Sequence, residues 1–210
     1  MASYIWRWRL EVMLALGLIL CMSYSLLGEA AHEWLGTAVL AGFLWHLAIN
    51  RRWFHALGCG RWSKRRVLST ITDGLLCFFT LGLIVSSLML SKYAFPVLDL
   101  PESVGATPHQ ICATWGFLFV ALHLGQHGRG FVRPITERVS LSQNSWRALL
   151  GMVCIGGALA FFWQNMPAQL FLQSQGFAPH SGLALYLASY AAIFVLVACL
   201  GYRLQKGGRP

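Results

Sequence analysis

Two pairs of histidines in this sequence have a spacing that suits metal binding from helices. Fourteen positions separate His32 from His46, and fourteen separate His109 from His123. In an α-helix this spacing brings both members to within about 40° of one face, roughly 21 Å apart along the axis. Imidazole is a common axial ligand of haem iron. Each of the two segments therefore offers one imidazole near each of its ends.

The segments that must position these histidines are apolar enough to cross a bilayer. Hydrophobic residues make up 57% of the 210 residues and charged residues only 11%, against roughly 25% charged in soluble domains. Several apolar runs approach the roughly 20 residues that a transmembrane helix needs. We expect an all-α integral membrane protein, a six-transmembrane helix bundle that forms a single domain over residues 1–210. The expected spans are about 8–27, 30–50, 71–93, 108–126, 146–165 and 181–202.

Positive charge is distributed unequally between the two ends of these spans. With six crossings, fifteen of the 16 lysines and arginines lie on one side and only Lys92 lies on the other. Because lysine and arginine mark cytoplasmic loops, we expect both termini to be cytoplasmic. The net charge of +9 is thus explained by basic residues in the expected cytoplasmic loops. Since no nucleic-acid motif accompanies it, we expect membrane lipid as a partner and no nucleic acid.

Spans two and four run parallel, because one span separates them. His32 is then level with His109 near the outer face, and His46 is level with His123 near the cytoplasmic face. Two imidazoles that face each other can supply both axial ligands of one haem iron, so we expect two haem b groups stacked across the bilayer. The alternative for a single intramembrane histidine is an interhelical hydrogen bond. The repeated spacing on two parallel spans favours haem.

Small residues lie within one or two turns of these histidines. Gly36 is one turn from His32, Gly42 is one turn before His46, and Gly116 follows His109 by two turns. A porphyrin ring is flat and bulky, so it needs positions without side chains. The alternative is close packing between membrane helices, which is favoured for any single one of these glycines.

Further basic residues lie just beyond the expected inner haem. His127 is one turn past His123, where it could contact a haem propionate, substitute as a ligand or cap the helix. Arg51 and Arg129 could pair with propionates, although positive-inside topology alone explains them. His180 opens the last span, as a quinone contact or as a surface histidine. No catalytic residue is predicted.

The cysteine pattern indicates structural rather than catalytic thiols. None of the six cysteines forms C-x-x-C or C-x-x-C-H, which argues against a disulfide framework, a zinc site and covalent c-type haem. The first apolar run lacks a small-residue cleavage site, so we expect a retained helix and no signal peptide.

Two stretches resemble the flavinylation-associated cytochrome domain family. HEWLGTAVLAGFLWHLAINRRWF, residues 32–54, is similar to the family's first histidine helix, and HQICATWGFLFVALHLGQH, residues 109–127, is similar to its second. The H-x13-H pairing is shared with respiratory cytochromes b and ferric-reductase-like domains. The resemblance implies His32, His46, His109 and His123 as axial ligands of two haem b irons.

The resemblance also implies a multi-pass protein of the bacterial inner membrane that transfers electrons. Members move electrons between quinol or cytoplasmic donors and extracytoplasmic acceptors, often proteins with covalently attached FMN. This chain has no appended flavin-bearing domain, so we expect a flavoprotein or other redox protein as a separate partner. Quinone is an expected ligand, and a homo-oligomer is left open.

Two other functions are compatible with the sequence. One is a stand-alone haem oxidoreductase that oxidises superoxide or reduces ferric iron. The other is a histidine-based metal transporter, which would need acidic or methionine ligands near the midplane and broken helices. Glu29 and Glu33 flank the expected outer haem, as proton relays for a quinol or as a solvated helix start.

Overall fold

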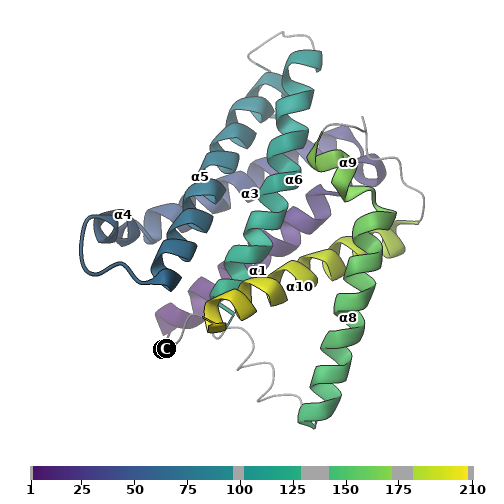
Figure 1. Cartoon of the computed structure of the whole chain (residues 1–210). Coiled ribbons are helices and arrows are strands. Elements are labelled where there is room, and N and C mark those ends of the chain that lie inside the picture. The colour runs from purple at the N-terminus through teal and green to yellow at the C-terminus, as the bar shows by residue number, and fades with distance from the viewer. Residues whose placement is uncertain (1, 97–101, 129–141, 172–181, 208–210) are drawn as a thin grey trace.

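The protein is helical throughout the part of the chain that the structure, a computed structural model, describes: residues 2–96, 102–128, 142–171 and 182–207 (Figure 1). Long helices dominate this part. They are α1 (Ala2–Cys21), α3 (Glu29–Ile49), α5 (Lys64–Leu90), α6 (Glu102–Gln126), α8 (Gln143–Trp163) and α10 (Leu183–Gly207). Three short helices accompany them, namely α2 (Tyr24–Leu27), α4 (Arg52–Leu57) and α9 (Met166–Leu170). The expected all-α fold is confirmed over these residues.

Within the described ranges, three helices are long and apolar enough to cross a membrane: Lys64–Leu90, Gln143–Trp163 and Leu183–Lys206. These spans support the expected membrane character of the chain. The remaining long helices carry polar residues that lower their hydropathy. Charged residues enter α1, and α3 and α6 each carry two of the paired histidines. The residues that could do chemistry are thus the ones that weaken the apolar signal.

The helix bounds differ from the expected spans at several places, two of which bear on the site. A turn at Met22 and Ser23 separates α1 from α2, so the first apolar run is not one continuous helix. The fourth span was expected to begin at Pro108, but α6 begins six residues earlier, at Glu102, and Pro108 lies inside it. Pro108 lies in the second turn of α6, where it has no N–H to donate to the carbonyl of Val104, four residues before it.

The buried core lies where α1, α6, α8 and α10 meet. Phe117 of α6 and Tyr190 and Ile193 of α10 are each 0% exposed. A Cβ atom at Gly125 of α6 would collide with the backbone of Ala198, so only glycine allows α6 and α10 to approach this closely. The core fixes the position of α6 and of its two histidines.

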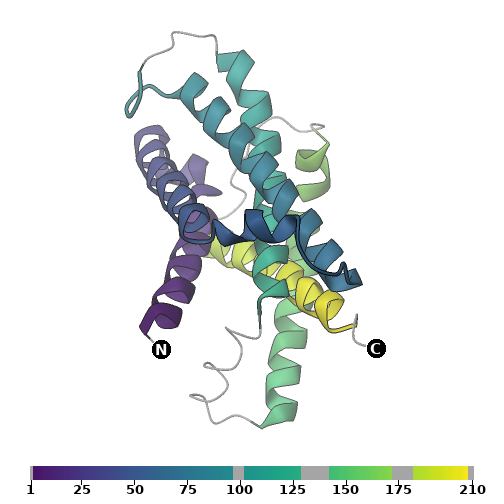
Figure 2. The same ribbon diagram turned by 90° about the vertical axis from the view of Figure 1, so that its left-hand side faces the viewer.

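Helix α3 stands outside this core. None of its residues is buried, and it packs mainly on α1. Figure 2 shows α3 set off from α5 and α6, which run side by side. The face of α3 that carries the histidines therefore borders the space between α3 and the α5–α6 pair.

The basic ends of several helices gather on one side of the molecule. In Figure 1 the start of α1, α4 after the end of α3, the start of α5 and the end of α10 all lie towards the lower left. The cluster of arginines and lysines at residues 51–66 and the pair Arg203 and Lys206 belong to these ends. The charge asymmetry of the sequence is thus also an asymmetry in space.

Candidate functional site

The four spaced histidines meet in two facing pairs. The ring centroids of His32 and His109 are 6.1 Å apart, and those of His46 and His123 are 6.4 Å apart. Two imidazoles that bind one metal ion from opposite sides have ring centres roughly 6.3 Å apart, since each metal–nitrogen bond is about 2.0 Å and the ring centre lies about 1.1 Å beyond the nitrogen. Both pairs therefore have the separation that shared axial ligation requires.

The chain positions one member of each pair on α3 and the other on α6. Helix α6 is fixed by the core and by α5, where the Gln126 side-chain amide donates to the Thr72 hydroxyl at 2.9 Å. Helix α3 is held at its start by Glu33, whose carboxylate accepts hydrogen bonds from the Ser91 hydroxyl and the backbone of the following residues. The packing of α3 on α1 and the Glu33 contact at the start of α3 therefore set the width of the gap between α3 and α6.

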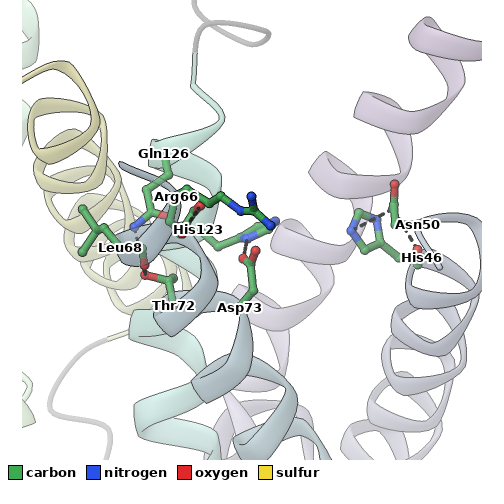
Figure 3. A network of polar contacts seen from close by, with 9 residues as sticks. His46, Asn50, Arg66, Leu68, Thr72, Asp73, His123 and Gln126 are labelled. Carbon is green, nitrogen blue, oxygen red and sulfur yellow. Dashed lines mark hydrogen bonds and ion pairs between the residues drawn. The ribbon is translucent and has the colours of Figure 1, made fainter. Parts of the chain in front are cut away.

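The inner pair, His46 and His123, has polar partners on both sides. Asp73 of α5 lies 2.7 Å from Nδ1 of His123, with side chains only 15% and 20% exposed respectively. Figure 3 shows Asp73 pointing at His123, with His46 and Asn50 across the gap. A hydrogen bond at Nδ1 leaves Nε2 of His123 for a metal. The Asn50 amide lies 3.3 Å from Nε2 of His46, a long contact that ligation would replace.

The outer pair has weaker partners. The hydroxyls of Ser86 and Ser87 on α5 each lie 3.4 Å from Nδ1 of His109. Nδ1 of His32 is buried, and no hydrogen-bond partner for it exists among the described residues. Because buried ring nitrogens are costly without partners, this pair also fits a ligand.

A large cavity opens beside the inner pair. Its volume is about 990 Å³, and both His46 and His123 line it. This volume is at the upper end of the range of roughly 300–1,000 Å³ found for small-molecule and cofactor pockets. Apolar side chains from four helices form its walls: Leu14, Phe43, Leu76 and Val120. Arg51 and Arg52 line it at the end where α3 finishes.

The three glycines lie in different surroundings. A Cβ atom at Gly42 would meet Leu14 of α1, and one at Gly116 would touch Phe79 and Leu83 of α5. Gly42 therefore lies at a close contact between α3 and α1, whereas the contacts at Gly116 are ordinary van der Waals contacts. A Cβ atom at Gly36 would meet nothing within 4 Å.

Of the remaining predicted site residues, two line the cavity and two lie outside the residues that the structure describes. Arg51 is exposed and lines the cavity. His127 is exposed, lines the same cavity, and has its ring centroid 4.7 Å from that of His123. Arg129 and His180 lie outside the described residues.

Sequence reasoning missed the partners that α5 supplies. Asp73, Ser86 and Ser87 approach His123 and His109 from α5. An acidic residue near the start of the expected span 71–93 was the available signal for Asp73, because ionisable residues within such segments mark function. Asp73, His123 and His127 also place one potential metal ligand each within 4.8 Å of one another.

The segment after α8 packs on α6. Its first residues form α9, in which Met166 is 0% exposed, and Trp115 of α6 donates to the carbonyl of Leu170 at 3.2 Å. This part of the predicted 166–180 loop is therefore packed on α6, while residues 172–180 lie outside the described chain.

Comparison with known proteins found no similar protein. No protein-family model, curated protein or solved structure matches this chain. The function therefore has to be inferred from the residues and their geometry.

Proposed function

We propose that this protein is a transmembrane b-type cytochrome that carries electrons between two bis-histidine haems across the bacterial inner membrane. The observation that carries the proposal is the pair of centroid separations, 6.1 and 6.4 Å, at two levels on the same two helices. A chance pair of intramembrane histidines would explain one such distance. It would not explain two with the separation of axial ligands.

The residues present fit haem b. His46 and His123 flank a cavity of about 990 Å³ with apolar walls and arginines at one end. The apolar walls suit the porphyrin ring, and Arg51 and Arg52 suit its propionates. Bound haem supplies an iron that alternates between the ferric and ferrous states by one electron. The chain supplies four imidazoles, a low-dielectric sheath and a fixed orientation.

Two levels of ligands suit transfer across a membrane. His109 and His123 lie fourteen positions apart on α6, which corresponds to roughly 21 Å along the helix. Between them α1, α3, α5 and α6 pack around a small cavity of about 40 Å³ lined largely by apolar side chains. An electron would thus pass from one level to the other through protein rather than water.

Six crossings with both termini in the cytoplasm are part of the proposal. The six long helices and the gathering of basic helix ends on one side (Figure 1) support it. By the positive-inside rule this basic side is cytoplasmic. The His46–His123 level is then the inner one.

The resemblance to flavinylation-associated cytochromes suggests the partners. We propose the quinone pool as one redox partner and an extracytoplasmic flavoprotein or other redox protein as the other. Haem edges near each membrane face would serve such partners without any catalytic side chain.

Electron transfer through vesicles tests the function. Purified protein in liposomes with trapped ferricyanide, given dithionite outside, should bleach the ferricyanide faster than protein-free liposomes. His123→Ala should lower the rate to that of protein-free liposomes, because one haem level loses a ligand. His55→Ala, which changes an exposed histidine of α4, should retain the wild-type rate. A wild-type rate equal to that of protein-free liposomes would refute the proposal.

A non-haem metal ion at the inner level is the second candidate. Asp73, His123 and His127 offer ligand atoms within 4.8 Å of one another, and carboxylate with imidazole is a common donor set for transition metals. Metal bound without any b-type absorption in the purified protein would favour this candidate over haem.

A further inference from the structure

The two histidine pairs differ in the group that contacts Nδ1 of the α6 histidine. At the inner pair it is the Asp73 carboxylate, 2.7 Å from His123. At the outer pair it is two serine hydroxyls, each 3.4 Å from His109. A carboxylate is an ionised and strong hydrogen-bond acceptor, whereas a hydroxyl at that distance is neutral and weak.

Such a partner changes the electronic character of a metal-bound imidazole. A carboxylate that accepts a hydrogen bond from Nδ1–H raises the basicity of the imidazole ligand. A more basic and more negative ligand set stabilises ferric over ferrous iron, and hydrogen bonding and net charge are among the factors that set haem potentials. Taken alone, this contact gives the site with the carboxylate the lower reduction potential.

Other charges also lie near the two pairs. Arg51 and Arg52 line the inner cavity with positive charge but are exposed, so water and salt screen them. Glu33 is next to His32 in sequence, but its carboxylate accepts hydrogen bonds from Ser91 and from backbone N–H groups of the segment after α5. Glu11 also lines the inner cavity, and its charge acts in the same direction as that of Asp73.

We propose that Asp73, through its hydrogen bond to Nδ1 of His123, makes the His46–His123 haem site the lower-potential centre of the two. This inference rests on the proposed function, because it requires a haem at each pair. Asp73 is a positioning residue in this role, since it acts on iron only through His123.

The ordering gives electron transfer a direction. With a haem held at each pair, one electron would pass from the His46–His123 site, which would be oxidised, to the His32–His109 site, which would be reduced, with a decrease in free energy. With the basic side in the cytoplasm, the favourable direction is from the cytoplasmic face outward. Donors on the cytoplasmic side and acceptors on the outer side fit this order.

Redox titration of the purified holoprotein, followed by its visible absorption, tests the inference. The wild type should titrate in two components. Asp73→Asn removes the charge but keeps an amide oxygen as acceptor, so the lower potential should shift upward while the higher one stays unchanged. Asp73→Glu keeps the charge and should keep both potentials near those of the wild type.

Two further variants control for structural damage. Ser86→Ala should leave the lower component unchanged, because it alters only the outer pair. If Asp73→Asn fails to retain two haems, Asp73→Ser replaces it, since a serine reproduces the neutral partner of the outer pair and should raise the same component. Haem content is measured for each variant alongside its potentials.

The outcomes separate the two proposals. Two haems with unchanged potentials in both Asp73→Asn and Asp73→Ser would overturn the inference and leave the proposed function intact. An upward shift of the higher component instead of the lower would also overturn it. A wild-type protein without haem would overturn both proposals.

Discussion

At the scale of single residues, two glutamates at the start of α3 have different partners. Glu33 accepts hydrogen bonds from the Ser91 hydroxyl and from the backbone N–H groups of Lys92 and Ala94, at 3.1 and 2.6 Å for the latter two. Glu29 forms an ion pair with the Lys92 ammonium at 2.7 Å, with side chains 40% and 46% exposed. Only Glu33 ties α3 to the backbone after α5.

This difference predicts unequal effects of neutralising the two side chains. Glu33→Gln should destabilise the protein by about 1–3 kcal/mol, because it weakens several hydrogen bonds to a charged acceptor. Glu29→Gln should cost about 0–1 kcal/mol, as expected for an exposed ion pair. Unfolding of the two purified variants in the same detergent measures the comparison. Equal losses would show that the Glu33 contacts do not hold α3.

The site residues were only partly predictable from sequence. Spacing alone gave His32, His46, His109 and His123, because a helix converts fourteen positions into a shared face. It could not give Asp73, since that contact depends on how α5 and α6 pack. Partners from a different helix require tertiary geometry.

At the scale of elements, helix existence was easier to predict than helix bounds. The apolar runs identified each long helix, but α6 begins before Pro108 and the first run breaks at Met22 and Ser23. Termini depend on local backbone hydrogen bonds rather than on hydropathy. Ser63, which accepts from the backbone N–H of Arg66 at 3.3 Å, begins α5 seven residues before the expected span.

The position of α3 outside the buried core could not be predicted from the hydropathy pattern of the sequence. Most residues of α3 are apolar, yet none of them is buried. Instead α3 rests on α1 and presents its histidines across a gap to α6. The cavity of about 990 Å³ beside His46 and His123 lies in this gap.

At the scale of the whole molecule, the distribution of charge predicts the orientation in the membrane. The segment between α3 and α5 carries arginines and one exposed cysteine, Cys59. Among the described cysteines the others are buried or half-buried. Cys59 is therefore a natural reporter for the side on which the basic helix ends lie.

We expect a membrane-impermeant maleimide to label Cys59 only after the inner membrane is opened. Phe95→Cys in a Cys59→Ser background lies beyond the other end of α5, at an exposed position, and should be labelled in intact spheroplasts. Gel-shift of the labelled protein reports both results. Labelling of Cys59 in intact spheroplasts would contradict the cytoplasmic placement of the basic side.

The most direct test of the central claim is a haem count per chain by pyridine haemochrome. Wild-type protein should contain two haem b. His32→Ala and His109→Ala should each leave one, and so should His46→Ala and His123→Ala, because every haem needs both members of its pair. His55→Ala, which changes an exposed histidine of α4, is the matched control and should retain two. A wild type without haem, or paired-histidine variants that keep two, would contradict the account.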